Sequence, residues 1–269
     1  MIPFNSLCAT RYGFAIVHTH DLYVAQSLLL YGEFSPDEMD LYRFLLEPGD
    51  VVLEAGANLG ALTLPIAQVV GDAGLVFAFE PQLYTYYALC GTLALNSMVN
   101  VKAINLALGA TDGAIHVPPV NLNSPDNVGG VELDPAKAPN TQVVTVDGYQ
   151  LPRLTLLKLD VEGMELDVLQ GAVATIQRCR PLIVAEIDRE AKKPAVLAFL
   201  RAQGYRLYAH NPPLYRQDNW RGIDLNAWPG VVSFNVLAVP EERPALSDLI
   251  VRQFALEPIP DDTPQQEAA

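Results

Sequence analysis

The chain has 269 residues, half of them hydrophobic, and its 17 Lys and Arg against 31 Asp and Glu give a net charge of −14. This length suits one large α/β domain with additions. The sequence shows no basic cluster for nucleic acid or an anionic membrane surface, and no apolar run of eighteen residues for a bilayer, so it argues against these partners.

The cysteines and the N-terminus indicate a cytoplasmic protein. Cys8, Cys90 and Cys179 are far apart and form no CxxC pair, which is typical of reduced thiols. The N-terminal stretch lacks the basic start and long apolar run of a signal peptide. We therefore expect a cytoplasmic location.

Two strands are expected within residues 12–34, in YGFAIVHT and DLYVAQSLL. A helix is expected over 37–46, because Ser35 and Glu38 have the spacing of a capping box. The histidines of the first strand, His18 and His20, are interpreted as polar residues of an exposed strand.

From residue 51 onward, short apolar runs alternate with helical segments. Pro65 should kink the first of these helices or mark its real start. Strands separated by helices of this length indicate a parallel sheet. The expected strands are 51–55, 75–79, 101–106, 154–160, 181–188, 205–211 and 233–240, and the expected helices are 59–70, 83–97, 164–178 and 193–204.

Two long stretches, 118–140 and 211–230, lack the regular spacing of apolar residues that a helix or a strand would show. Loops of this length inside a domain are usually functional. The Asn211-Pro212-Pro213-Leu214 segment looks like the NPPY box of amide and base N-methyltransferases, but it follows the wrong strand and lacks the aromatic residue. We interpret it as a loop. The tail from about Glu257 is rich in Pro and Asp and is expected to be disordered.

The most informative feature is VVLEAGANLG at residues 51–60, a buried strand that enters a glycine turn. Its Gly56 and Gly60 let the backbone approach a ligand, and Glu80, twenty-four residues after Gly56, can accept two ribose hydroxyls. The turn is not GxGxxG, since Asn58 stands at the central position, and Glu54 precedes it. S-adenosylmethionine, which has an amino-acid head and no phosphates, matches this pattern better than a dinucleotide does.

A second constellation is LLKLDVEGMELDVLQGA at residues 156–172. Asp160 and Glu162 follow a strand, at the edge where open α/β sheets bind ligands. Glu165 and Asp167 fall in the first helical turn, where they complement the helix dipole. Lys158 lies on the same face as Asp160, and a buried Lys needs an acidic partner.

These blocks, EAGANLG, FAFEP, LKLDVEGMELDVLQGA and PLIVAEI, resemble the FkbM-type S-adenosylmethionine-dependent methyltransferases over roughly residues 30–240. The resemblance implies an α/β fold with a Rossmann-like, seven-stranded methyltransferase sheet, mostly parallel and covered by helices on both faces. It also implies a set of cofactor-binding residues. Glu54, Gly56, Asn58 and Gly60 would line the methionine and ribose, Glu80 would hold the ribose hydroxyls, Ala107 and Leu108 would lie against adenine, and Asp160 would face the amino end of the cofactor or the acceptor.

Three regions follow from this interpretation. Residues 1–50 would pack on the catalytic domain or cap it as an N-terminal strand and helix extension. Residues 51–240 would form the cofactor-binding domain, with loop insertions at 118–140 and 211–230. Residues 241–269 would be a C-terminal extension, disordered in part.

Methyl transfer to a hydroxyl needs a group that removes the hydroxyl proton. Asp160, Glu162 and Glu186 are acids at strand ends that could act as this base or hold a divalent cation. His210, at the end of another strand, is a further candidate. The sequence shows no complete set of metal ligands, so the metal-binding residues stay unknown.

The leading hypothesis is an S-adenosylmethionine-dependent methyltransferase (EC 2.1.1) that methylates a hydroxyl of a sugar or another small, natural-product-like acceptor. One alternative is an NAD-dependent oxidoreductase, although the third glycine of its fingerprint is missing. The other is a non-catalytic methyltransferase-like domain that binds a partner through the aromatic-rich segment 205–228. A homo-oligomer stays open.

Overall fold

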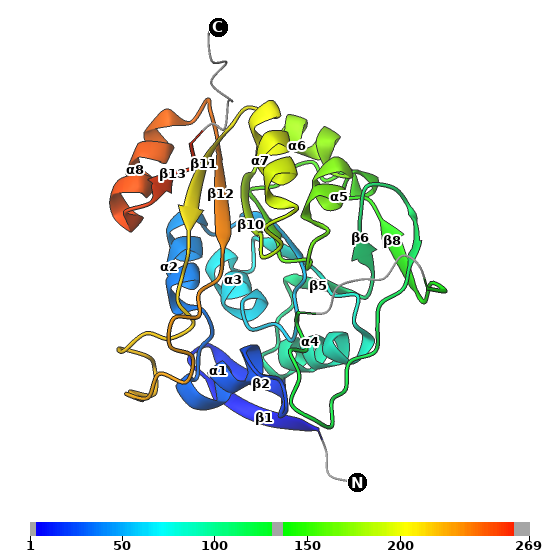
Figure 1. The fold of residues 1–269 in the computed structure, drawn as a ribbon, viewed down its shortest axis with the longest axis vertical. Helices are drawn as coiled ribbons and strands as arrows, with labels where there is room; N and C mark the ends of the chain where they lie inside the picture. The colour runs from blue at the N-terminus through cyan, green and yellow to red at the C-terminus, as the bar shows by residue number, and fades with distance from the viewer. Residues whose placement is uncertain (1–3, 131–136, 261–269) are drawn as a thin grey trace, which may run out of the picture.

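An eight-stranded sheet forms the centre of the computed structural model, which describes residues 4–130 and 137–260 (Figure 1). The strand order is β13-β11-β12-β10-β9-β3-β4-β5. Strands β3, β4, β5, β9 and β10 are parallel, whereas β12 lies antiparallel between β10 and β11. The expected α/β fold with a mostly parallel sheet is confirmed. The strands are β3 (Val51–Ala55), β4 (Leu75–Phe79), β5 (Val101–Ile104), β9 (Leu156–Leu159), β10 (Leu182–Glu186), β11 (Tyr205–His210), β12 (Asn235–Pro240) and β13 (Glu257–Pro258).

The expectation of seven strands is wrong by one edge strand. Glu257 and Pro258 form β13, which pairs antiparallel with Ala209 and Tyr208 of β11. Disorder from Glu257 onward is therefore also wrong for residues 257–260, and residues 261–269 lie outside the described part of the chain. The preceding segment, expected to be an extension, forms helix α8 (Pro244–Phe254) and joins the main sheet through β13.

Helices cover both faces of the sheet, and each face has its own apolar core. One core contains residues of α5 (Glu165–Gln170), α6 (Val173–Cys179) and α7 (Lys193–Ala202). The other contains residues of α2 (Pro36–Leu45), α3 (Thr63–Val70), α4 (Leu83–Leu95) and α8. Both faces of the parallel strands are thus buried, which explains why the sequences of these strands are continuous runs of apolar residues.

Two of the expected helices differ in detail from the structure. The first begins at Thr63, so Pro65 marks its start and causes no kink. The expected helix over 164–178 is divided into α5 and α6. A Cβ on Gly171 would come within 2.0 Å of the carbonyl oxygen of Gly109, and Asp147 caps the new helix by accepting hydrogen bonds from the backbone of Ala174 and Thr175.

The N-terminal segment forms a hairpin, β1 (Asn5–Thr10) and β2 (Gly13–His18), followed by helix α1 (Val24–Tyr31). The strand expected in DLYVAQSLL is therefore wrong. The buried Asp21 carboxylate accepts a hydrogen bond from the backbone of Ala25 at 2.6 Å and so favours a helix there. The helix expected over 37–46 does form as α2, but Ser35 makes no capping hydrogen bond, and Glu38 instead accepts one from Tyr42.

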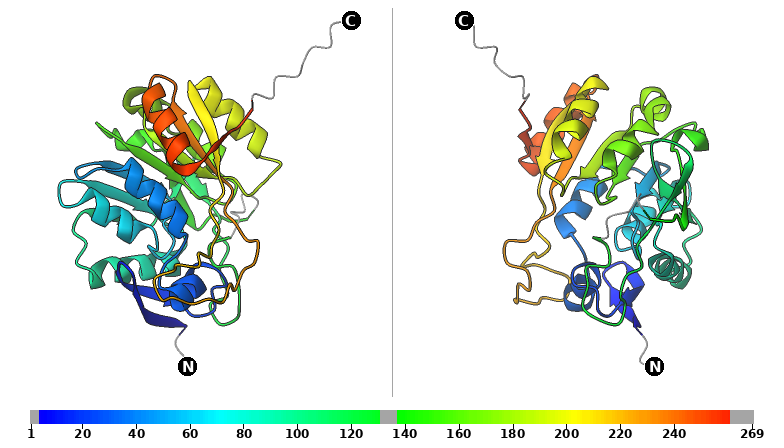
Figure 2. Two further views of the ribbon diagram at one scale, coloured as in Figure 1. Left: turned by 90° about the vertical axis from the view of Figure 1, so that its left-hand side faces the viewer. Right: turned by 45° about the vertical axis from the view of Figure 1, so that its right-hand side comes forward.

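Both long loops pack against the N-terminal segment. Residues 211–230 run beside α1, where Tyr31 donates a hydrogen bond to the carbonyl oxygen of Leu225 and accepts one from the backbone of Ala227, both at 2.9 Å (Figure 2). The 118–140 loop reaches the same region, since the backbone of Leu22 donates to the carbonyl oxygen of Asp126. The chain between β5 and β9 forms a separate small sheet of β6 (Ala107–Leu108), β7 (Gly113–Ile115) and β8 (Thr141–Val144). The short 3-10 helix η1 (Asp147–Tyr149) follows it.

Within the described residues, no helix combines the length and the hydrophobicity that a membrane span requires.

Candidate functional site

The site lies where the carboxyl ends of β3 and β9 meet. From β3 the chain passes to β4 and β5 on one side of the sheet, and it returns to β9 and β10 on the other. This reversal is the switch point at which α/β sheets bind ligands. The backbone N–H of Asp160 donates to the carbonyl oxygen of Ala55 at 2.9 Å and joins the two strand ends.

Gly56 is required by this junction. Its φ is +84°, and a Cβ there would lie 1.8 Å from the carbonyl oxygen of Asp160. A side chain would therefore force the two strand ends apart. Asn58 also has a left-handed φ, +51°, which Asn tolerates better than most residues do.

Glu80, just after β4, is fixed by backbone donors. Its two oxygens accept hydrogen bonds from the N–H groups of Asn58, at 2.9 Å, and Gln82, at 2.8 Å. The side chain is almost fully buried, and burial raises the pKa of Glu80 to about 7 despite these donors. The carboxylate is held at the edge of a cavity.

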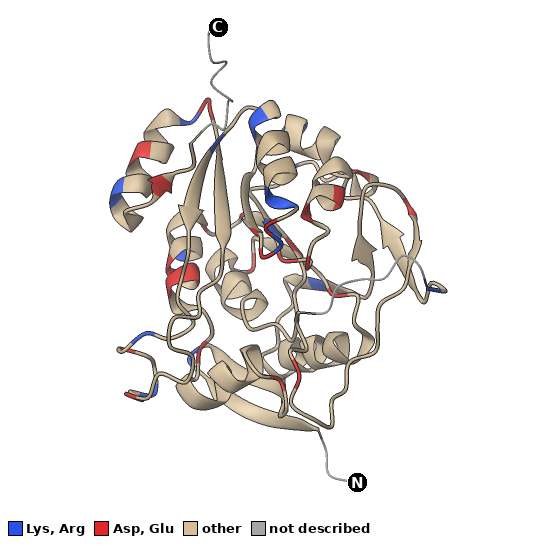
Figure 3. Cartoon of the chain, in the orientation of Figure 1, with Lys and Arg blue, Asp and Glu red and all other residues tan. Residues whose placement is uncertain are grey.

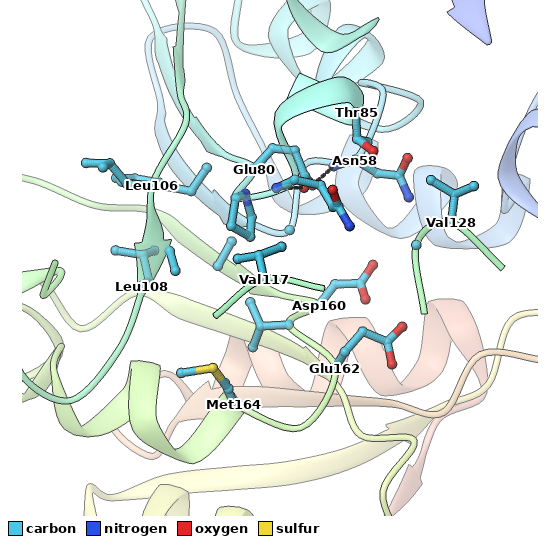
Figure 4. A pocket seen from close by; sticks show the side chains of 18 residues that line it. Asn58, Glu80, Thr85, Leu106, Leu108, Val117, Val128, Asp160, Glu162 and Met164 are labelled. Carbon is cyan, nitrogen blue, oxygen red and sulfur yellow. Dashed lines mark hydrogen bonds between the residues drawn. The ribbon is translucent and has the colours of Figure 1, made fainter. Parts of the chain in front are cut away.

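This first cavity encloses about 610 Å³, including the part that is open to solvent. Figure 4 shows Leu106, Leu108 and Met164 along one part of its wall, and Asn58 and Asp160 on another. The lining therefore combines an apolar slot with a polar rim. Its other members include Ala55, Gly56, Phe79, Glu80, Gln82, Thr85, Ala107, Val117, Val128, Gly129 and Glu162.

Lys158 connects the site to the interior. Its Nζ lies 3.4 Å from Oδ2 of Asp160 and 3.7 Å from Oε1 of Glu54. The buried Lys therefore has two acidic partners, where the sequence led us to expect one. Burial lowers the pKa of Lys158, but the carboxylates of Asp160 and Glu54 outweigh burial and raise it above its ordinary value. Lys158 is therefore charged and limits the movement of Asp160.

Glu54 itself is buried below the cavity. Its other oxygen accepts a hydrogen bond from the hydroxyl of Thr63 at 2.6 Å, and its side chain lines neither the first cavity nor its neighbour. Gly60 is also absent from both linings. Among the cofactor residues expected from the sequence, Gly56, Asn58, Glu80, Ala107, Leu108 and Asp160 do line the first cavity.

A second cavity of about 900 Å³ adjoins the first and shares Gly56, Asn58, Glu80, Gly129, Asp160 and Glu162 with it. Glu186 and Asp188 line it at the end of β10, and the rest of its wall comes from outside the main sheet. The N-terminal segment provides Tyr23, Val24 and Phe34, and the 118–140 loop provides Asn127 and Gly130. Leu214, Val231, Val232 and Ser233 come from the connection between β11 and β12.

Acidic residues gather where the strands end, at the centre of the molecule in Figure 3. Glu162 pairs with Arg189 at 2.9 Å, yet burial, followed by the nearby Asp160, raises its pKa to about 8. Burial and Asp160 also raise the pKa of Glu186, well above its ordinary value, and that of Asp188. Protons are thus held on this part of the site near neutral pH.

The structure does not bring His210 to these acids. It lines a third cavity, of about 970 Å³, together with Asp37, Asp40 and residues 254–257. Burial lowers the pKa of His210 to about 4, so its ring is neutral at pH 7. His18, interpreted as exposed, is in fact 1% exposed, and its Nδ1 lies 2.6 Å from Oδ1 of Asn5.

No group of three or more His, Cys, Asp or Glu in the described ranges, 4–130 and 137–260, has an arrangement that could hold a metal ion.

Several lining residues were not expected from the sequence. Met164 follows Glu162 by two positions and could have been found by extending the strand-end argument. Val117 and Val128 could not, because contacts with distant residues place them: the side chain of Asn140 accepts a hydrogen bond from the backbone of Val117 at 2.8 Å, and the long loop folds against Asp21 at Val128. The carboxylate of Asp21 accepts a hydrogen bond from the backbone of Val128 at 3.2 Å.

The family model described as "Methyltransferase FkbM domain" matches residues 54–207, more than half of the chain. The 31-O-demethyl-FK506 methyltransferase FkbM of Streptomyces tacrolimicus is 27% identical over 237 residues, which are 76% of this chain and 90% of that protein. The hexuronic acid methyltransferase AglP of Haloferax volcanii is 30% identical over 156 residues, 55% of this chain and 61% of that protein. A crystal structure of Methyltransferase FkbM from Methylobacillus flagellatus KT aligns with a TM-score of 0.47 and 16% identity, over 81% of this chain and 55% of that one.

Proposed function

The chain belongs to the FkbM methyltransferase family, and on that premise we propose that it transfers a methyl group from S-adenosylmethionine to a hydroxyl of a sugar or another small, natural-product-like acceptor. The observation that carries the proposal is the pair of adjoining cavities that meet at Asp160. The first cavity has apolar and polar groups that complement those of the cofactor, and the second has room for an acceptor beside it.

The residues of the first cavity fit S-adenosylmethionine. A carboxylate that already accepts backbone N–H groups, Glu80, has lone pairs left for the two ribose hydroxyls. Leu106, Leu108 and Met164 offer an apolar slot for a flat aromatic ring. Asp160 provides a negative charge for the amino group, and Lys158 holds that charge in place. Glu54 would act through Lys158, without touching the cofactor.

S-adenosylmethionine supplies a methyl group that its sulfonium already activates. The protein must then align the acceptor hydroxyl and remove its proton. Of the acids that we considered, we propose Glu186 as the base. It lines the second cavity, and burial together with the nearby Asp160 raises its pKa, so that in its ionised form it binds a proton more strongly than an ordinary carboxylate does. Asp160 and Glu162 are tied to Lys158 and Arg189, and His210 lies in another cavity.

The three expected regions take roles in this proposal. Residues 51–240 would bind the cofactor, while the extension 1–50 and the loops 118–140 and 211–230 would shape the acceptor site, since all three contribute to or brace the second cavity. Residues 241–269 would support the edge of the sheet through α8 and β13.

Isothermal titration calorimetry with S-adenosylhomocysteine, S-adenosylmethionine and NAD tests the cofactor. We expect heat from both sulfur ligands and none from NAD, which would also remove the oxidoreductase alternative. Binding of NAD alone would overturn the proposal.

Turnover tests the catalytic part. S-adenosylhomocysteine should be formed when acceptor is present, whereas a non-catalytic binding domain forms none. Glu186→Gln should lower kcat by roughly 100-fold or more, as expected for a lost general base, without changing the affinity for S-adenosylhomocysteine. An unchanged kcat would reject Glu186 as the base.

A further inference from the structure

The lining of the second cavity has an apolar part and an acidic part. Tyr23, Val24, Phe34, Leu214, Val231 and Val232 form the apolar part. The acidic part consists of Glu80, Asp160, Glu162, Glu186 and Asp188. Among the described residues that line this cavity there is no Lys, Arg or His. The cavity therefore presents acidic and apolar side chains, but no basic side chain, to whatever enters it.

Three of these carboxyl groups are already compensated by the protein. Glu80 accepts two backbone N–H groups, Asp160 pairs with Lys158, and Glu162 pairs with Arg189. Glu186 and Asp188 are different: neither is within ion-pair distance of a cation in the described part of the chain, and the charges of Lys158 and Arg189 offset only part of the rise in their pKa values.

The two uncompensated carboxyls belong to the second cavity and not to the first. The positive charge of the cofactor, which would meet Asp160, therefore does not account for them. Burial and the neighbouring Asp160 oppose their ionisation in the free protein, and a cation that enters the cavity would relieve that cost.

Ser233 is an independent sign of a polar ligand. It lines the same cavity, it is 7% exposed, and its hydroxyl can both donate and accept a hydrogen bond there, as a hydroxyl acceptor requires.

From these observations we propose that the acceptor is a hydroxyl compound that also carries a protonated amine, of the aminosugar type, with an apolar part against Tyr23 and Phe34. The ammonium group lies against Asp188, which leaves Glu186 to the hydroxyl, and acceptors with a carboxylate or phosphate at this position are excluded by repulsion. A protonated amine has no lone pair, so the hydroxyl receives the methyl group. This inference rests on the proposed function and names the acceptor class of its second cavity.

A matched set of probes tests the charge preference: the phenyl glycosides of glucosamine, glucose and glucuronic acid, titrated into the protein saturated with S-adenosylhomocysteine. They share the ring and the apolar phenyl group and differ in one substituent. We expect the glucosaminide to bind at least tenfold more tightly than the glucoside, and the glucuronide more weakly than both. S-adenosylhomocysteine is titrated first, so failure of the cofactor site is recognised separately.

Asp188→Asn should weaken the glucosaminide several-fold and leave the glucoside unchanged. The matched control is Glu190→Gln, which removes the same charge two residues away. Glu190 pairs with Lys193, its side chain is 77% exposed, and it does not line the cavity. Glu190→Gln should leave all three affinities unchanged.

The amine assignment is overturned if the glucuronide binds as tightly as the glucosaminide, or if the glucosaminide does not bind up to its solubility limit. It is also overturned if Glu190→Gln weakens the glucosaminide as much as Asp188→Asn does, because the effect would then be one of overall charge. Glucuronide binding that appears only with added Mg²⁺ would reassign these carboxyls to a cation.

Discussion

At the scale of single residues, the site depends on carboxyl groups whose charge is set by their surroundings. Glu80, Glu162 and Glu186 are all buried acids with raised pKa values, but they differ in what compensates them. Glu80 has backbone donors, Glu162 has Arg189, and Glu186 has no such partner in the described chain. In the proposed function, the same residue type would therefore bind a ribose, form an ion pair or accept a proton.

Cofactor affinity should depend on the ionisation of Glu80. The carboxylate accepts two hydroxyl donors, whereas the protonated acid loses acceptor capacity. Because the pKa of Glu80 in the free protein is about 7, affinity for S-adenosylhomocysteine should fall as the pH drops below 7 and level off above about pH 8. Calorimetry between pH 6 and 8.5 measures this.

The matched variant is Glu80→Gln, which keeps the size of the side chain but cannot ionise. It should bind S-adenosylhomocysteine about 10- to 100-fold more weakly, the value of a hydrogen bond to a charged group, and with little dependence on pH. A wild-type pH profile in the variant would refute this role of Glu80.

Gly56 and Gly49 allow a controlled test of the β3–β9 junction. Both have positive φ, +84° and +96°, but a Cβ at Gly56 would meet the carbonyl oxygen of Asp160, whereas one at Gly49 meets nothing within 4 Å. Gly49→Ala should cost roughly 1 kcal/mol of unfolding free energy, from backbone strain alone. Gly56→Ala should cost at least about 3 kcal/mol and abolish cofactor binding. Equal costs in urea denaturation would show that the close approach of the strands does not matter.

At the scale of elements, much of the wall of the second cavity comes from segments that have no regular structure of their own. The connection between β11 and β12 is held against α1 by side chains that bond to its backbone. Tyr31 and Glu33 contact it near Leu225 and Trp220, and Arg216 pairs with Asp37 and Asp40 of α2. The loop is thereby ordered by the N-terminal extension.

Tyr31→Phe should loosen this loop. The variant removes two partly buried hydrogen bonds between α1 and the loop, each worth about 0.5–1.5 kcal/mol. We expect faster proteolysis within residues 211–230 and a higher KM for the acceptor, with unchanged affinity for S-adenosylhomocysteine. Tyr215→Phe is the control, since its hydroxyl makes only solvent-exposed bonds within the loop. Equal effects of the two variants would contradict the bracing role of Tyr31.

At the scale of the whole molecule, the net charge of −14 is distributed unevenly, and part of it lies where the strands end. A carboxyl group that is uncharged in the folded protein near neutral pH holds a proton that the unfolded chain has released. Such groups make the folded state less stable as the pH rises.

Stability should therefore fall on the alkaline side of neutrality. In the unfolded chain Glu80 and Glu162 ionise near pH 4.5, and in the folded protein near pH 7 and pH 8. Their contribution is greatest below pH 4.5, decreases as the pH rises, and is lost above about pH 8. We expect the free energy of unfolding to fall by about 2–3 kcal/mol between pH 6.5 and 8.5. Urea denaturation of the wild type and Glu162→Gln checks this, and an equally steep fall in the variant would exclude Glu162 as a cause.

Particular residues show how far sequence-based prediction reached. The periodicity of apolar residues and the spacing of glycines were sufficient to predict the main strands and the turn at Gly56, because these local structures depend on residues that are neighbours in the chain. The N-terminal helix was missed because its cap, Asp21, acts through a side-chain bond that no periodicity reveals. Glu54 and His210 stand at strand ends or next to glycine turns, yet one faces the interior and the other a different cavity.

The sequence by itself determined the α/β class, the glycine turn after β3, the acids at the strand ends and the family, because each of these is encoded within short segments whose spacing is fixed by strand and helix geometry. Only the tertiary structure decided which acids are compensated, which residues face the cavities and what forms the walls of those cavities. Those properties depend on contacts between segments far apart in the chain, such as Tyr23, Asp188 and Leu214, and on the burial that follows when they come together.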